Sequence, residues 1–94
     1  MVRERTVLGA TGGDDAVRHE ARRLRDAGQE VVYVGGGQTP EQLVRTAVAE
    51  DATALVVDAD PDALGAIADL CGALGAPDLV VTPLDATRVG RRSR

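Results

Sequence analysis

Short apolar segments alternate with helix-start signals along most of this chain, and this alternation constrains its fold more than any other feature. Four segments are expected as strands, at residues 5–10, 30–34, 54–57 and 79–82. Their β-branched residues favour strands, and their continuous apolar runs are typical of strands buried on both faces of a parallel sheet. Strands that alternate with helices imply right-handed crossovers, which bring the strands into one parallel sheet.

Each expected helix begins at an N-terminal signal. Asp14 or Asp15 can cap the first helix. Thr-Pro-Glu-Gln at residues 39–42 is a capping box with Pro at the first helical position, and Asp60 with Pro61 opens the third helix. Gly28 and Gly75 end the first and third helices. Each helix is expected to bury one apolar face: Val17, Ala21 and Leu24 on the first, Leu43, Val44, Ala47 and Val48 on the second, and Leu64, Ile67, Ala68, Cys71 and Leu74 on the third.

The pattern predicts a small three-layer α/β domain of the flavodoxin-like (Rossmann-like) class, with four parallel strands in the order 2-1-3-4. Its 94 residues suffice for one domain, at residues 1–83, followed by an Arg-rich C-terminal tail at residues 84–94. The chain has one Tyr, no Phe and no Trp, so its core has to be aliphatic.

Composition excludes several classes of function. The formal net charge of −4 argues against general affinity for nucleic acid, and the absence of Lys removes Schiff-base chemistry. A single Cys cannot form an intramolecular disulfide, which favours a reducing compartment. No apolar run has the length of a membrane span, and the N-terminus carries no apolar signal segment. We therefore expect a cytoplasmic protein with no membrane partner.

Four motifs carry a resemblance to a known family: Arg-Asp-Ala-Gly at 25–28, Val-Val-Tyr at 31–33, Gln-Thr-Pro-Glu at 38–41 and Glu-Asp at 50–51. The chain resembles the cobalamin-binding domain of methylmalonyl-CoA mutase and related carbon-skeleton mutases, over about residues 7–81. These motifs specify the fold and do not contact cobalt. The resemblance therefore supports the predicted fold more directly than it supports a ligand.

The chain departs from the family pattern at the positions that matter for the cofactor. The family carries Asp-x-His-x-x-Gly, and the resemblance implies that this His ligates cobalt while the Asp orients it. Residues 11–16 read Thr-Gly-Gly-Asp-Asp-Ala, which places Gly13 at the ligand position. The Ser-rich loop after the third strand is replaced by Asp-Ala-Asp-Pro at 58–61, and the later Gly-Gly pair by Pro83 and Leu84. The fifth strand and its helix are missing, so the resemblance is to a truncated, degenerate form.

No residue is predicted to be catalytic, cofactor-binding or metal-ligating, and no cofactor is expected, with cobalamin left open. His19, the only histidine, lies off the apolar face of its helix and is expected at the surface. Cys71 lies on an apolar face and is expected to be buried and inert. Glycines 35–37 are expected as a strand-to-helix turn, with contact to a phosphate as the weaker interpretation.

Acidic residues follow three of the strands, at the edge where open α/β folds bind ligands. We expect them to serve as helix caps facing the positive helix ends, with a weak divalent-cation site as the alternative. Phosphoryl transfer of the receiver-domain kind would need a lysine, which this chain does not have. The residues are Asp14, Asp15, Asp58, Asp60, Asp62 and Asp85.

The function predicted from these features is that of a non-catalytic accessory or interaction protein associated with a mutase-type system. Two alternatives stay open. One is a cobalamin carrier that binds the cofactor without a protein ligand to cobalt, and the other is a regulatory domain with a weak divalent-cation site. The expected partner is a mutase-type protein or a second copy of the chain, joined through the edge of the fourth strand near residues 79–81.

Overall fold

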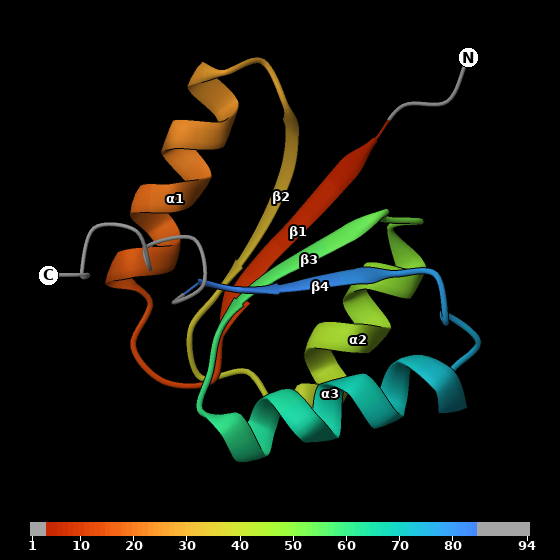
Figure 1. Cartoon of the computed structure of the whole chain (residues 1–94). Coiled ribbons are helices and arrows are strands. Elements are labelled where there is room, and N and C mark those ends of the chain that lie inside the picture. Colours follow the sequence, from red (N-terminus) through yellow and green to blue (C-terminus); the bar gives the residue numbers. More distant parts are fainter. Residues whose placement is uncertain (1–3, 85–94) are drawn as a thin grey trace, which may run out of the picture.

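A four-stranded parallel sheet in the order β2-β1-β3-β4 is the framework of the computed structural model, which describes residues 4–84 (Figure 1). Both the fold class and the strand order predicted from the sequence are confirmed. Residues 85–94, which make up most of the predicted tail, lie outside the described residues. The elements in chain order are β1 (Arg5–Ala10), α1 (Asp15–Asp26), β2 (Glu30–Gly35), α2 (Pro40–Ala49), β3 (Ala54–Asp58), α3 (Pro61–Ala73) and β4 (Val80–Pro83).

The helices cover both faces of the sheet, with α1 on one face and α2 and α3 on the other (Figure 1). Because side chains alternate along a strand, Val7 of β1 packs toward α2 and α3 while Leu8 packs toward α1. The core under α2 and α3 contains Val7, Leu43, Val44, Ala47, Leu55, Val57, Ile67 and Cys71, and the core under α1 contains Leu8, Ala10, Val17, Ala21, Leu24, Val56 and Leu84.

Two of the three expected helix starts have the predicted chemistry. Thr39 Oγ1 accepts the Gln42 backbone N–H at 3.0 Å, and Gln42 Oε1 accepts the Thr39 N–H at 2.8 Å, which is the reciprocal capping box. Asp60 Oδ1 caps α3 by accepting the Ala63 N–H at 2.8 Å. Gly28 adopts a φ of 89° just after α1, the left-handed conformation that ends a helix.

Some predicted buried positions are wrong. Val56 and Val57 of the central strand β3 are buried, but Val31 and Val32 of β2 are only half-buried and Val80 of β4 is 60% exposed. The physical reason is position in the sheet, because β2 and β4 are its two outer strands. On the helices, Val48 is 44% exposed and Ala68 is also exposed, while Leu64 and Leu74 are half-buried.

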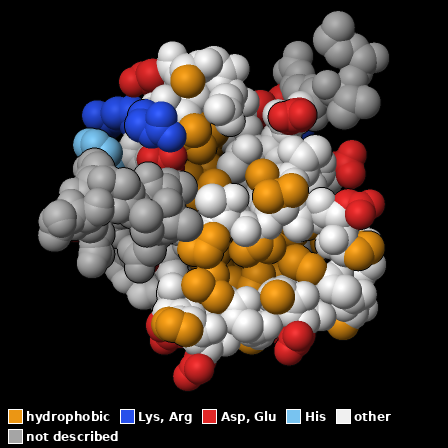
Figure 2. Space-filling view, viewed as in Figure 1, with side chains coloured by type: hydrophobic (Ala, Val, Ile, Leu, Met, Phe, Trp, Pro, Cys, Tyr) orange, Lys and Arg blue, Asp and Glu red, His pale blue; other side chains and the backbone are white. Residues whose placement is uncertain are grey.

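The β4 side of the molecule carries much of its visible apolar surface. Figure 2 shows apolar side chains gathered between β4 and α3. Leu70 of α3, Leu79 just before β4 and Val81 of β4 are only partly buried where they pack against the core under α2 and α3. No helix within residues 4–84 has the length and apolar character needed to cross a membrane.

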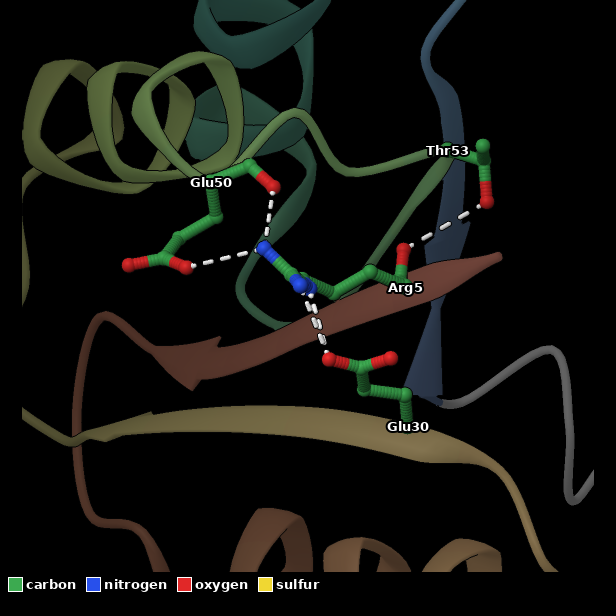
Figure 3. Close-up of polar contacts among 4 residues, drawn as sticks. All are labelled: Arg5, Glu30, Glu50 and Thr53. Carbon is green, nitrogen blue, oxygen red and sulfur yellow. Dashed lines mark hydrogen bonds and ion pairs between the residues drawn. The ribbon is translucent and has the colours of Figure 1, made fainter. Parts of the chain in front are cut away.

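At the end of the sheet where the strands begin, Arg5 joins β1 to β2 and to the end of α2 (Figure 3). Arg5 of β1 donates from Nε and Nη2 to Glu30 Oε2 of β2 at 3.1 and 2.8 Å. Its Nη1 donates to the backbone oxygen of Glu50 at 2.9 Å and to Glu50 Oε1 at 3.3 Å, just after α2. The guanidinium therefore holds the first strand to its neighbour and to the end of a helix.

Candidate functional site at the carboxyl rim

The loops that follow β1, β2 and β3, at residues 11–14, 36–39 and 59–60, meet at the carboxyl ends of the strands, and we call these loops the carboxyl rim. Parallel sheets of this topology bind ligands there, at the point where the chain connections diverge to the two sides. In this sheet that point lies between β1 and β3, because the chain crosses from β1 to β2 on one side and from β3 to β4 on the other.

Asp14 is the N-cap residue of α1, as expected, but its side chain makes no capping hydrogen bond. The hydroxyl of Tyr33, on β2, donates instead to Asp14 Oδ2. This hydrogen bond, with partial burial and the negative charge of Asp14, raises the pKa of the Tyr33 phenol above its usual value. The predicted cap is therefore a cross-loop tether, which ties the first rim loop to the neighbouring strand.

Gly36 makes the same two loops fit together. A Cβ at this position would lie well inside van der Waals contact of the Gly12 carbonyl oxygen, and 3.1 Å from the Cβ of Asp14. Two backbone hydrogen bonds accompany this approach, from Gly37 N–H to the Gly12 oxygen and from Gln38 N–H to the Ala10 oxygen, both at 3.0 Å. The glycine run at 35–37 is thus a strand-to-helix turn, as expected, and its middle residue is where the backbones meet.

The first rim loop is also tied to the β3 side. Thr11 N–H donates to the Asp58 backbone oxygen at 3.1 Å, across the point where the connections diverge. Hydrogen bonds on both sides therefore hold the β1–α1 loop in place.

Gly13 lies in this held loop but faces solvent. It is exposed, and a Cβ built on it would have no atom within 4 Å. At the position where the resemblance implies an imidazole, the chain supplies no side-chain donor and leaves open space.

The acidic residues do not converge. Asp60 is used as a helix cap, Asp58 is half-buried and Asp62 is exposed. Within residues 4–84, no group of three or more His, Cys, Asp or Glu side chains is placed to hold a metal ion. Asp85 lies outside the described residues.

His19 and Cys71 lie where the sequence predicted, on opposite sides of the sheet. His19 is exposed on α1, and Cys71 is 6% exposed in the core under α2 and α3. Burial raises the pKa of the Cys71 thiol, which keeps it protonated and poorly nucleophilic. The two residues cannot act as a nucleophile and its base.

Sequence reasoning missed two features of the rim. No local signal identifies Tyr33 as a partner of Asp14, because the two residues are 19 positions apart and meet only through the pairing of β1 with β2. The glycine run signals a turn, but it does not show which glycine the neighbouring loop contacts.

Comparison with known proteins gives one informative match. No family model matches the chain. Over 50 residues the chain is 48% identical to the small subunit of 2-hydroxyisobutanoyl-CoA mutase from Aquincola tertiaricarbonis. The match covers 53% of this chain and 37% of that subunit, so the chain matches little more than a third of the relative's length. The similarity supports the predicted relationship to mutase subunits.

Proposed function

We propose that this chain is a non-catalytic accessory or interaction module of a mutase-type system, in which the histidine ligand to cobalt has been lost. The observation that carries the proposal is Gly13, an exposed glycine in open space at the family's ligand position. The similarity to a mutase small subunit supports the mutase association. His19 cannot replace the ligand without unwinding the start of α1, since it lies on the exposed side of that helix.

The internal hydrogen bonds of the rim also support the proposal. The Tyr33 hydroxyl donates to the Asp14 carboxylate, and the Thr11 backbone N–H donates to the Asp58 backbone oxygen, so these groups are already paired within the protein. A loop that is held by its neighbours can keep its shape with no cofactor present. Such a module would contribute a stable surface rather than a reactive centre.

The decisive experiment is a visible spectrum of the protein after incubation with hydroxocobalamin and desalting. We expect little or no retained cobalamin. Retention with the cofactor's own base still on cobalt would favour the carrier function instead. Retention with a histidine-ligated spectrum that disappears in His19→Ala would refute the proposal.

A pair of variants at Gly13 tests whether the missing imidazole, and not another change in the rim, accounts for weak cobalamin binding. Gly13→His returns an imidazole to a position with room for a side chain. We expect this variant to retain more cobalamin than the unmodified protein, whereas Gly13→Ala should behave like the unmodified protein. Equal cobalamin retention by all three proteins would mean that the missing imidazole does not limit binding and that other residues of the rim do.

For the partner, we propose a contact through the β4 side, made either with a mutase-type protein or with a second copy of the chain. The exposed Val80 and the apolar side chains between β4 and α3 support this choice (Figure 2). Light scattering at micromolar concentration should show a dimer if the partner is a second copy, and Val80→Arg should dissociate it. A monomer at every concentration would rule out the homodimer.

A further inference from the structure

A groove at the edge where the strands begin is distant from the carboxyl rim and has no part in the proposed function. Two segments line it, residues 47–53 from the end of α2 to the start of β3, and residues 75–79 from the turn between α3 and β4. Figure 1 shows this turn and the α2–β3 turn at the same end of the sheet. The groove has a volume of about 260 Å³, enough for a small molecule or one long side chain.

The walls of the groove combine apolar and polar surface in similar amounts, and its charged residues have one sign. Ala47, Ala52 and Leu79 line it and also pack in the core under α2 and α3. Among residues 4–84, the charged residues that line the groove are Asp51 and Asp78, both exposed, and none of the lining residues is Arg or His. An occupant therefore meets an aliphatic surface with carboxylates at its margin.

Two helix ends add to the negative potential. Both α2 and α3 end beside the groove, with C-caps at Glu50 and Leu74, and neither helix has a basic residue in its last turn. In contrast, α1 ends with Arg23 and Arg25. The carbonyl groups at a helix C-terminus carry a partial negative charge that attracts cations.

The chain itself shows that a guanidinium binds at one of these helix ends. Arg5 donates to the backbone oxygen and the carboxylate of Glu50, outside the groove. No comparable side-chain contact is described at the end of α3, where Asp78 adds its own charge.

We propose that this groove binds an organic cation, namely an ammonium or guanidinium group on a short aliphatic stem. The stem packs on the apolar wall while the cationic head lies near Asp51 and Asp78. The same chemistry is offered by a free amine or guanidine and by an arginine or lysine side chain of a bound protein, and the test below distinguishes these sources.

The first measurement is a titration of ¹⁵N-labelled protein with n-butylguanidinium, followed by amide chemical shifts. We expect saturable shifts at Ala52, Thr53 and Ala76, with a dissociation constant on the order of 1 mM for so small a probe. The neutral isostere n-butylurea and the anion butyrate should give no saturable shift. Saturation by the neutral isostere with equal affinity, or by no probe, would overturn the proposal.

The second measurement repeats the titration with a capped Gly-Arg-Gly peptide. Saturation of the same amides would identify a site for a protein side chain. Saturation by the free probe alone would identify a small-molecule site.

Variants test the role of the two carboxylates. Asp51→Asn with Asp78→Asn should weaken binding of the probe by about threefold to tenfold, the effect of two exposed ion pairs. Asn suits position 51, whose φ of 54° lies in the left-handed region that Asn tolerates. The control is Asp26→Asn with Asp69→Asn, which changes the net charge equally at exposed sites outside the groove.

Equal weakening by both pairs of substitutions would mean that net charge, not the groove, attracts the cation, and would overturn the assignment. If the groove variant does not fold, salt provides the same test in the unmodified protein. Binding should weaken when NaCl is raised from roughly 0.02 to 0.5 M, because exposed charges are screened over that range. Unchanged affinity would refute the electrostatic part of the proposal.

Discussion

The same substitution at two neighbouring strands should have very different effects on stability. Val56 of β3 is 8% exposed and packs in the core under α1, whereas Val80 of β4 is 60% exposed. Parallel pairing places β4 directly beside β3. Val56→Asp and Val80→Asp therefore make the same chemical change at a covered and an uncovered position of one sheet.

The magnitude follows from burial. Val56→Asp loses the burial of a Val side chain, about 1.5–3 kcal/mol, and leaves a carboxyl group without a partner in an apolar core, which costs a further ~2–4 kcal/mol. A chain of 94 residues has about 5–14 kcal/mol of stability in total. The summed loss of roughly 3.5–7 kcal/mol ranges from about a quarter of this stability to all of it. For Val80→Asp the carboxylate stays in water, and we expect a loss of about 1 kcal/mol or less.

Urea denaturation followed by far-ultraviolet circular dichroism measures both changes, since the chain has no Trp for fluorescence. All variants are compared at one protein concentration, because self-association would add to apparent stability. A Val56→Asp variant that unfolds cooperatively at nearly the midpoint of the unmodified protein would refute the assignment of β3 as the central buried strand. A large loss in Val80→Asp would mean that its side chain is covered in solution.

Other positions give equally direct tests. Gly36→Ala should lower the unfolding free energy by about 1–3 kcal/mol because its Cβ meets the neighbouring loop, whereas Gly13→Ala should change it by less than about 0.5 kcal/mol; similar losses would contradict the close approach. Tyr33 is the only Tyr, so absorbance near 295 nm reports its titration, which should occur above pH ~10 and move toward that value in Asp14→Asn. Because its pKa is raised on folding, Tyr33 contributes stability that is fully present below pH ~10 and is lost as pH rises through the folded-state pKa. In Tyr33→Phe the free energy of unfolding, followed by urea midpoints, should therefore fall less at alkaline pH than in the unmodified protein. Arg5→Met should cost about 1–2 kcal/mol of unfolding free energy, limited by the partial exposure of its ion pairs, and an unchanged urea midpoint would show that the bridge between β1, β2 and the end of α2 adds nothing.

The elements of this protein were predictable because their signals act over a few residues. The capping box at 39–42 closes on itself within one helical turn, and Asp60 reaches an N–H only three residues away. Right-handed crossovers predicted the parallel sheet, and the strand order followed from assigning the alternating pattern to the flavodoxin-like class. The proposed loss of the cobalt ligand at Gly13 rests on the sequence alone and stays a prediction.

The parts that could not be predicted depend on contacts between distant segments. Val56 and Val80 have the same side chain in similar apolar runs, yet one is covered and the other is not, because β3 is central and β4 is outermost. The predicted strand order already placed the fourth strand at an edge of the sheet, but the expectation that its valines are buried came from the apolar run alone. The composition of a strand does not show how far its neighbours cover each side chain.

The carboxyl rim shows the same division. The amino-acid sequence by itself determined that the first rim loop has no histidine and carries a carboxylate at Asp14. Only the tertiary structure decided that this carboxylate accepts the hydroxyl of Tyr33 instead of capping its own helix, and that Gly36 closes on the same loop. The reason is that β1 and β2 must first pair before their loops can meet, and the choice between two hydrogen-bond partners for one side chain is made by that packing.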